Sequence, residues 1–307
     1  MHIVSVINYK GGVGKTTLTA NLGAELAYRG SKVLLLDLDP QASLTFSFVT
    51  PDYWHLNLSR DKTIKKWYDS FSGQVSMDLS SIIITPKRVG PFLGRTVGKL
   101  DLIPSDLGLI NVDLELATEL TAATLKQSKL KYLRVHRRLA DELIQPEFQD
   151  YDYVLIDCPP NFNIVTKTAI VASDHVLIPA KADYLSTLGI SYLRRSLDEL
   201  VSDYNEYSQL SSSDDDSPIS PQILGVIFTM MQFYGGRPIA ALRPYIEETK
   251  RLGVPVFDAS MRENKTRFAD APQYGVPLVL MNNPSSAYIV RELEALVSEF
   301  EERLEAS

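Results

Sequence analysis

Short apolar runs alternate with longer amphipathic stretches along most of the chain. Apolar runs bounded by turn-forming residues indicate buried strands, and strands covered on both faces belong to parallel sheets. One such run ends at Ile103. The other predicted strands are residues 3–7, 32–37, 154–157, 176–178, 223–228 and 278–280.

Helical periodicity fills several of the intervals between these runs. Residues 17–28 place Leu18, Leu22 and Leu26 on one side of a helix. Because strands and helices alternate, the predicted fold is α/β, with a doubly wound, mostly parallel sheet and helices on both faces. We expect residues 1–307 to form a single domain. Further helices are predicted at residues 164–171, 189–201 and 238–252.

Two regions interrupt this alternation. Residues from about 50 to 98 contain Pro51, Pro86 and Pro91 and lengthen the connection between two strands, which indicates an insertion. Residues 207–221 are polar, acidic and proline-terminated, which predicts a mobile surface loop. An inert insertion is the favoured interpretation of this loop, and a partner-binding role is the alternative.

Composition narrows the class of protein. The chain has 307 residues, of which 45% are hydrophobic, and this suffices for one large α/β core. No apolar run approaches the roughly 20 residues that span a bilayer, and no signal segment precedes the first strand. We therefore expect a cytoplasmic protein without a membrane partner. Because Cys158 is the one cysteine, a disulfide within the chain and a cysteine-ligated metal cluster are excluded.

The most specific motif directly follows the first predicted strand. It reads Lys10-Gly11-Gly12-Val13-Gly14-Lys15-Thr16-Thr17. Glycines here let backbone N–H groups approach phosphate oxygens, and the helix N-terminus that follows favours negative charge. A lysine in the place of Lys15 reaches the β- and γ-phosphates, and a hydroxyl in the place of Thr16 binds Mg²⁺. The motif predicts a nucleotide site formed by residues 11–17.

The loop departs from the standard pattern in one place. The first glycine of G-x-x-x-x-G-K-[ST] is absent, because Tyr9 stands at that position. The resulting sequence, K-G-G-x-G-K-T-T, resembles the deviant Walker A motif of the ParA/MinD family of P-loop NTPases, and ParA/Soj-type partition ATPases in particular. The resemblance implies that ATP is the nucleotide and that Lys10 reaches across a dimer interface to the partner's nucleotide.

Carboxylates follow two of the predicted strands, at the edge where open α/β sheets bind ligands. Asp37 and Asp39 belong to a D-x-D-P-Q segment, and Asp157 to a D-C-P-P segment. Both segments resemble switch regions of the ParA family. The resemblance implies that Asp39 orients or activates the attacking water, that Asp37 supports the Mg²⁺ shell, and that Asp157 holds Mg²⁺ through water. Asp39 thus completes a predicted catalytic set with Lys10 and Lys15.

Further matches extend the resemblance over residues 1–49, 100–200 and 221–300. They leave out the 50–98 insertion and the acidic loop. The chain departs from the family in one segment. ParA relatives commonly have a proline before an Arg-Asn dipeptide, whereas residues 261–265 of this chain are Met-Arg-Glu-Asn-Lys. The residues that contact adenine are therefore left open. The matching segments are residues 102–105, 151–160, 177–179 with a helix beginning near Leu188, and 269–277.

Proteins of the ParA family act as ATP-driven switches, and the resemblance implies the same cycle here. ATP would join two subunits into a homodimer that binds DNA nonspecifically. A ParB-like or other cargo adaptor would then trigger hydrolysis and release. Such a protein would be nucleoid-associated while it is bound to DNA. The alternative function is a regulatory scaffold that dimerises on ATP and recruits a partner without DNA.

DNA binding needs only a local basic face, so the net charge of −7 does not exclude it. One basic helix side is predicted within residues 121–140. It carries Lys126, Arg134, Arg137 and Arg138, opposite an apolar side of Leu125, Tyr132, Val135 and Leu139. Because DNA contacts of the family lie in the C-terminal half, a second set is favoured. This set is Arg194, Arg195, Arg237, Arg243, Arg262, Lys265 and Arg267.

The sequence disfavours three related functions. A MinD-like membrane ATPase would end in a basic amphipathic helix, whereas residues 291–307 carry six glutamates and two arginines. A reductase related to the nitrogenase iron protein would need paired cysteines for an iron–sulfur cluster. A tyrosine autokinase would carry a C-terminal tyrosine cluster, and the last tyrosine of this chain is Tyr288.

Overall fold

A six-stranded sheet forms the centre of the computed structural model, which describes residues 1–72, 77–94, 97–210, 217–235, 237–281 and 283–307. Every neighbouring pair of strands in it runs parallel, in the order β3-β2-β4-β1-β5-β6. The predicted parallel α/β fold is confirmed. The strands are β1 (His2–Val6), β2 (Lys32–Asp37), β3 (Lys99–Ile103), β4 (Tyr153–Asp157), β5 (His175–Ala180) and β6 (Gln222–Phe228).

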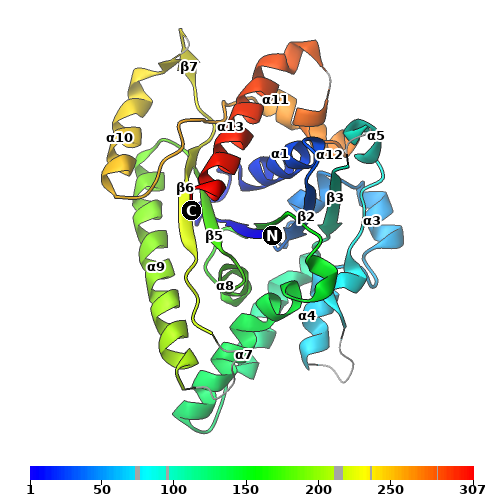
Figure 1. Ribbon diagram of the computed structural model, residues 1–307, viewed down its shortest axis with the longest axis vertical. Helices are drawn as coiled ribbons and strands as arrows, with labels where there is room; N and C mark the ends of the chain where they lie inside the picture. The colour runs from blue at the N-terminus through cyan, green and yellow to red at the C-terminus, as the bar shows by residue number, and fades with distance from the viewer. Residues whose placement is uncertain (73–76, 95–96, 211–216, 236, 282) are drawn as a thin grey trace.

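Helices cover both faces of this sheet (Figure 1). One face is covered by α1 (Lys15–Tyr28) and α13 (Ala287–Glu305). The other is covered by α4 (Ile64–Ser72), α6 (Val112–Glu119), α7 (Leu125–Leu143), α8 (Ile164–Val171) and α9 (Tyr184–Ser208).

Residues of the central strands alternate between the two hydrophobic cores. In β2, Leu34 and Leu36 enter one core, whereas Val33 and Leu35 enter the core beneath α1. This burial on both faces explains why the strands are continuous apolar runs in the sequence.

Shorter elements connect the two layers and form the rims of the sheet. The short helices are α2 (Ser43–Phe46), α3 (Pro51–Asn57), α5 (Gly90–Leu93), α10 (Arg243–Arg251), α11 (Lys265–Phe268) and α12 (Asp270–Tyr274). A two-stranded hairpin consists of β7 (Phe233–Tyr234) and β8 (Arg237–Pro238). The 3-10 turns are η1 (Leu79–Ile82), η2 (Leu107–Asn111), η3 (Pro146–Phe148), η4 (Ala240–Leu242), η5 (Leu278–Leu280) and η6 (Pro284–Ser286).

The strand register brings the functional segments to one edge. β1 lies between β4 and β5 although it comes first in the chain, and Val6 pairs with both Asp157 and Leu177. β2 pairs with β4 so that Asp37 stands beside Asp157. The carboxyl ends of β1, β2 and β4 therefore meet where an open α/β sheet binds its ligand.

The predicted strand at residues 278–280 is wrong, because these residues form the turn η5, buried beside α1 and α13. The N–H of Val279 donates to Oδ1 of Asn21 (3.0 Å), and the N–H of Leu280 donates to the carbonyl of Pro277 (3.1 Å). These bonds satisfy the backbone without a neighbouring strand. An apolar run alone does not distinguish the two outcomes.

Helix α9 begins earlier than predicted, at Tyr184 rather than at residue 189 or near Leu188. Asp183 caps its N-terminus, because its Oδ1 accepts the N–H of Ser186 (2.8 Å). Helix α8 occupies the predicted range.

Helix α10 begins at Arg243 rather than at residue 238. Pro244 stands in its first turn, where the fixed φ of proline favours helix initiation. The preceding residues form β8 and η4, which the helical pattern did not predict.

The insertion at residues 50–98 carries α3, α4, η1 and α5 in its described part. It joins the sheet through a short antiparallel bridge between Ile84 and Leu102 of β3. Residues 73–76, 95–96 and 211–216 lie outside the described residues, so the predicted mobility of the acidic loop stays a prediction.

Helix α7 does not present the free basic side that was predicted. The guanidinium of Arg138 stacks on the ring of Trp67 (4.4 Å to the centroid) and donates to the carbonyl of the same residue (2.9 Å). Arg134 lies over the ring of Phe71. Leu125, predicted on the apolar side, is 75% exposed. Helix α4 of the insertion covers this part of α7, which helical spacing alone cannot predict.

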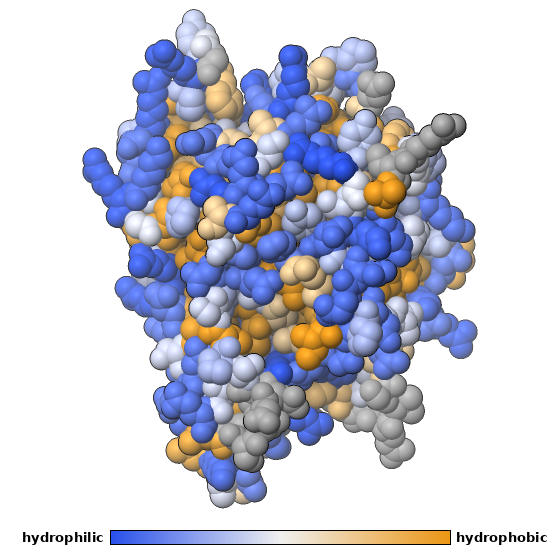
Figure 2. Space-filling model, viewed as in Figure 1, coloured by the Kyte–Doolittle hydropathy of each residue, from blue (hydrophilic) through white to orange (hydrophobic). Residues whose placement is uncertain are grey.

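Within the described ranges, no helix is long and apolar enough to cross a membrane. Figure 2 shows the face on which both chain ends lie, where hydrophilic side chains predominate and hydrophobic ones are scattered. Scattered apolar residues are normal on a protein surface.

Candidate nucleotide-binding site

The loop between β1 and α1 has the geometry of a phosphate cradle. Gly12 and Gly14 adopt φ angles of 66° and 81°, which glycine adopts without strain. Gly14 is the N-cap of α1, so the first N–H groups of the helix have no partner within the helix. No atom lies within 4 Å of a Cβ placed on Gly11 or Gly12. The loop is therefore open to an anion at a helix N-terminus.

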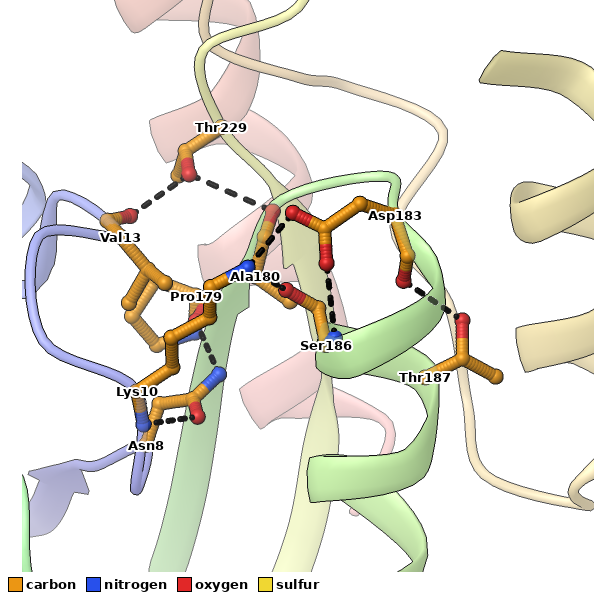
Figure 3. Close-up of polar contacts among 9 residues, drawn as sticks. All are labelled: Asn8, Lys10, Val13, Pro179, Ala180, Asp183, Ser186, Thr187 and Thr229. Carbon is orange, nitrogen blue, oxygen red and sulfur yellow. Dashed lines mark hydrogen bonds and ion pairs between the residues drawn. The ribbon is translucent and has the colours of Figure 1, made fainter. Parts of the chain in front are cut away.

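Two residues that the sequence analysis missed hold this loop in place. Asn8 donates from Nδ2 to the carbonyl of Pro179 (2.8 Å) and accepts the N–H of Lys10 on Oδ1 (2.9 Å). Thr229 donates from Oγ1 to the carbonyl of Val13 (2.6 Å). The loop is thus tied to the ends of β5 and β6 (Figure 3). A polar residue directly after the apolar run of β6 is the signal that would have identified Thr229.

Lys15, Thr16 and Asp157 come together beside the loop. The ammonium of Lys15 is buried and donates to the carbonyl of Asn8 (3.3 Å). Burial lowers the pKa of Lys15, although the charges of Asp157 and Asp39 oppose this change. The hydroxyl of Thr16 donates to Oδ2 of Asp157 (2.7 Å). One cation and one hydroxyl therefore adjoin the carboxylate that ends β4.

Asp157 has the surroundings of a magnesium ligand. It is buried, and its Oδ1 has no hydrogen-bond partner among the described residues. Burial and the charge of Asp37 raise the pKa of Asp157 well above its usual value, against the effects of Thr16 and Lys15. An unpartnered carboxylate oxygen beside a hydroxyl fits Mg²⁺, which prefers oxygen ligands.

Among the residues that the structure describes, protein side chains alone form no metal site. The described ranges contain no group of three His, Cys, Asp or Glu residues that could hold a metal ion. Magnesium at nucleotide sites needs only one or two protein ligands, because phosphates and water supply the rest. The neighbouring Cys158 is buried, and burial raises the pKa of its thiol, which favours a packing role.

Asp37 has both carboxylate oxygens occupied by hydrogen bonds. Oδ2 accepts the N–H and the hydroxyl of Thr45 (2.7 Å each), and Oδ1 accepts the N–H of Asp39 (3.2 Å). Burial raises the pKa of Asp37 to about 7, although the bonds from Thr45 lower it. These contacts fix α2 against β2. The proposed place of Asp37 in the Mg²⁺ shell therefore stays a prediction.

Asp39 lies on the wall of a cleft that opens over the phosphate loop. Its Oδ1 accepts the N–H of Gln41 (2.9 Å), and its carbonyl accepts the hydroxyl of Ser105 (2.7 Å). The cleft has a volume of about 490 Å³ and is lined by the loop, by Asp39, and by Phe268 and Pro272 from the C-terminal part of the chain. This volume lies within the range of ligand pockets.

A second pocket, of about 260 Å³, adjoins the cleft. The two share Gly14, Thr17, Met230 and Phe268. Met230 follows β6 with a φ of 52°, a conformation that strains a residue with a bulky side chain. Met261 and Asn264 add to the wall. Residues 261–265 line this pocket, and they are the segment in which the sequence left the adenine contacts open.

The side chain of Lys10 points away from the cleft that Lys15 lines. Its ammonium lies 2.6 Å from Oδ2 of Asp183 and 3.4 Å from Oγ of Ser186, at the N-terminus of α9 (Figure 3). The side chain of Lys10 is 30% exposed, and Lys10 does not line the cleft. Although burial raises it, the pKa of Asp183 is lowered overall by the hydrogen bonds from Lys10 and Ser186.

The DNA-binding candidates fall into two groups. In the first, Arg194 and Arg195 lie on α9, and Arg194 donates to the carbonyl of Leu252 just after α10 (2.6 Å). Arg237 in β8 and Arg243 at the start of α10 are exposed. The residues of this group lie on or near α9 and α10, two helices that pack against each other.

The second group borders the pocket of about 260 Å³ that adjoins the cleft. Arg262 and Lys265 line that pocket, and Arg267 is in the same short helix as Lys265. Arg262 forms an ion pair with Glu292, with 2.9 Å between Nε and Oε1. The guanidinium of Arg262 also lies over the ring of Phe233 in β7 (5.1 Å to the centroid), so this group adjoins the hairpin that carries Arg237. A DNA-binding role of the seven residues stays a prediction.

Comparison with known proteins agrees with this geometry. A family model described as an AAA domain matches residues 1–210. The sporulation initiation inhibitor protein Soj of Bacillus subtilis is 30% identical over 278 residues, which cover 91% of this chain and 90% of Soj. The chain belongs to the ParA/Soj family of P-loop ATPases. The chromosome partitioning protein ParA of Caulobacter vibrioides is 26% identical over 310 residues, covering 100% of this chain and 98% of that protein.

The ParA/Soj fold is also found among solved structures. An ATP complex of a McdA variant from Cyanothece has a TM-score of 0.69 at 24% identity, over 99% of this chain and 96% of that chain. Membership of the family supports nucleotide hydrolysis and a role in segregating DNA or another cargo. The resemblance that rested on the residue 10–17 loop is thereby confirmed.

Proposed function

We propose that this ParA/Soj-family protein is a Mg²⁺-dependent ATPase that dimerises on ATP, binds DNA nonspecifically as a dimer, and positions DNA or another intracellular cargo. The observation that carries the proposal is the different placement of two lysines of one loop. Lys15 is buried beside its own cleft, whereas Asp183 holds Lys10 outside it. Because Lys10 does not line the cleft of its own subunit, it can contact a nucleotide bound by a second subunit.

Within one subunit, the backbone of residues 11–17 binds the phosphates and Lys15 neutralises their charge. Thr16 and Asp157 hold Mg²⁺, which when bound neutralises charge that develops on the phosphates. Asp37 supports this site by fixing α2, and Asp39 orients the attacking water from the cleft wall. The phosphoryl-transfer chemistry needs positioning and charge neutralisation more than covalent help.

The second subunit would complete the site. In the proposed dimer, each Lys10 leaves Asp183 and approaches the phosphates bound by the partner. Because the added positive charge acts only in the dimer, hydrolysis becomes coupled to dimerisation.

Light scattering with ATP or ADP tests this coupling. Lys10→Ala should retain nucleotide binding and remain monomeric with ATP, whereas Asp39→Ala should accumulate an ATP-bound dimer with slow turnover. Lys126→Ala, which removes an exposed lysine on α7, is the matched control. Unaltered ATP dimers of Lys10→Ala would contradict the cross-subunit role. Unchanged hydrolysis by Asp39→Ala would remove Asp39 from the catalytic set.

Retention on nonspecific duplex DNA distinguishes the segregation function from the scaffold alternative. The ATP-bound protein should be retained and the ADP-bound protein should not, with a steep loss of affinity as salt increases. Arg195→Glu and Arg243→Glu should weaken retention without affecting turnover. An ATP dimer that ignores DNA even at low salt would favour the scaffold.

The remaining parts of the proposal follow the partition relatives. A ParB-like or other cargo adaptor would stimulate hydrolysis, and the DNA-bound protein would be nucleoid-associated. Residues 1–307 would act as one ATPase domain that carries the 50–98 insertion. Truncation before that insertion should therefore abolish nucleotide binding.

A further inference from the structure

A pocket separate from the nucleotide cleft lies at the β3 edge of the sheet. Figure 1 shows α3 and α5 beside this edge. The chain that follows α2 forms one wall, and residues 84–88 of the insertion form the other. The pocket has a volume of about 220 Å³. Its floor is apolar, because Phe48, Val49 and Pro86 are buried and Ile84 is partly buried.

Hydrogen bonds hold both walls in place. Ile84 exchanges two backbone hydrogen bonds with Leu102 of β3 (2.9 and 2.8 Å). The hydroxyl of Thr85 donates to Oδ1 of Asp101, a buried residue of β3 (2.5 Å). On the opposite wall, Thr50 caps α3 by accepting the N–H of Tyr53 (3.3 Å). The pocket is therefore formed in the free protein, as is usual for ligand sites.

The rim of the pocket is cationic. Lys87 and Arg88 line it and are exposed, and the lining residues include no aspartate or glutamate. Asp52, in the first turn of α3, lies outside the lining. Tyr53 adds an aromatic ring that is 38% exposed. A ligand with negative charge beside an apolar group would match this surface.

The size and the floor of the pocket narrow the class of ligand. A cavity of about 150 Å³ admits benzene, whereas larger small molecules occupy about 300–1,000 Å³. The pocket therefore admits one aromatic or branched aliphatic side chain. A nucleobase is disfavoured, because the side chains of the floor offer no polar atom to its hydrogen-bonding edge.

We propose that this pocket binds an acidic peptide segment of a partner protein. One large apolar side chain of the peptide fills the cavity, and neighbouring carboxylates of the peptide contact Lys87 and Arg88. Anchors of this kind in desolvated pockets dominate the binding energy of many interfaces.

One wall of the pocket is connected to the carboxylates of the nucleotide site. The N–H groups of Phe48 and Val49 both donate to the carbonyl of Thr45 (3.0 Å each). Thr45 is the α2 residue that holds Asp37 through two hydrogen bonds. A side chain packed on Phe48 would therefore stabilise the position of α2.

The other wall is connected to the C-terminal side of the cleft. Arg88 donates to the carbonyl of Tyr274 (2.9 Å), close to Pro272, which lines the cleft. Gly275 approaches the carbonyl of Phe48 so closely that a Cβ there would lie 3.1 Å from its oxygen. The bound peptide would thus change the rate of ATP turnover. This regulation rests on the proposed function, whereas binding of the peptide does not.

Calorimetric titration of the full chain without nucleotide tests the binding. The probe is the peptide acetyl-Glu-Asp-Phe-Asp-Glu-amide. One control peptide has alanine in place of phenylalanine, and the other has lysine in place of all four acidic residues. The probe should bind at least about tenfold more tightly than either control. Equal affinities for the three peptides would overturn the proposal.

Two charge reversals locate the binding site. Lys87→Glu should weaken binding of the probe about fivefold or more, because an attraction becomes a repulsion. Lys126→Glu, at an exposed lysine of α7, should bind the probe as the unaltered chain does. An equal loss in both variants would indicate nonspecific attraction and overturn the proposal. Displacement of the probe by a short oligothymidine would assign the site to nucleic acid and would also overturn it.

Turnover measured with saturating probe tests the regulation. The rate should change at least about twofold in the unaltered chain, and the probe concentration that gives half of this change should be about fivefold higher or more in Lys87→Glu. A bound probe without effect on turnover would refute the regulatory role. Failure to hydrolyse ATP would refute the proposed function instead, while the binding measured without nucleotide would stand.

Discussion

Lys10 and Lys15 carry the same charge on the same loop and have different surroundings. Lys15 is buried beside Asp157, whereas Lys10 is partly exposed and pairs with Asp183. A partly exposed ion pair contributes little to the free energy of folding. Its main consequence is to keep one ammonium near α9 until something displaces it.

Asp183→Asn should release Lys10 without damaging α9, because asparagine also caps a helix by accepting the N–H of Ser186. We expect ATP-dependent dimers to form at a protein concentration about threefold lower, consistent with loss of one exposed ion pair. Analytical ultracentrifugation with ATP measures the change. The double variant with Lys10→Ala should give no dimers, and unaltered assembly of the single variant would show that the ion pair is no restraint.

His136 on α7 should make the protein sensitive to acid. It is buried and stacks on Tyr132 (3.9 Å between centroids), and burial lowers its pKa to about 4. An unfolded histidine has a pKa of about 6.5, so the unfolded state binds more protons between these values. Stability is therefore complete above about pH 6.5 and falls as the pH decreases towards about 4.

His136→Phe should remove this part of the acid sensitivity. Urea unfolding at pH 7 and pH 4.5 should show a loss of stability that is about 2–3 kcal/mol smaller than in the unaltered chain. His55→Gln, at an exposed position on α3, is the control and should keep the original loss. The same loss in all three proteins would disprove the role of His136.

The part of the site that the sequence predicted is the part encoded locally. Residues 10–17 form a contiguous motif, and Asp39 and Asp157 directly follow apolar strands. Asn8 and Thr229 were missed, because their roles depend on carbonyl groups that the fold brings from distant segments. The unpartnered oxygen of Asp157 is likewise a property of the packed structure.

Among the elements, the buried parallel strands were predictable because each one is a continuous apolar run. The run at residues 278–280 has the same character and forms η5, since Asn21 of α1 satisfies its backbone. Whether this run forms a strand or a turn therefore depends on Asn21, which is far away in the sequence. The cover of α4 over Arg138 was unpredictable for the same reason.

The junction between α1 and β3 should tolerate no side chain at Gly98. A Cβ on Gly98 would lie 1.9 Å from the carbonyl oxygen of Ala27, so the backbone would have to move. Gly98→Ala should lower the free energy of unfolding by at least about 2 kcal/mol. In Gly90→Ala the new Cβ has no atom within 4 Å, and the change should stay within about 0.5 kcal/mol. Equal effects in denaturant titrations would contradict this close approach.

At the scale of the whole molecule, the cleft joins segments from both ends of the chain. The phosphate loop lies near the N-terminus, whereas Phe268 and Pro272 come from the C-terminal part. A ligand in the cleft therefore connects regions that are distant in sequence. Binding to the folded state alone stabilises the whole fold.

ATP with Mg²⁺ should consequently raise the melting temperature. At a hundredfold excess over the dissociation constant, the gain is about 2.7 kcal/mol. Chelation of Mg²⁺ should reverse most of the shift, and Lys15→Ala should show little shift at the same ATP concentration. In Asp157→Ala the Mg²⁺-dependent part of the shift should become smaller, because Thr16 and the phosphates would still be available to the ion. A full Mg²⁺-dependent shift in that variant would remove Asp157 from the metal site.

The position of β1 between β4 and β5 has a consequence for synthesis on the ribosome. The N–H of Ile7 donates to the carbonyl of Leu177 (3.0 Å), and Asn8 reaches Pro179. At about 5–20 residues per second, β5 emerges on the order of ten seconds after β1. The phosphate loop lacks both contacts during that delay. We therefore expect fragments terminated before β5 to bind ATP more weakly than the full chain.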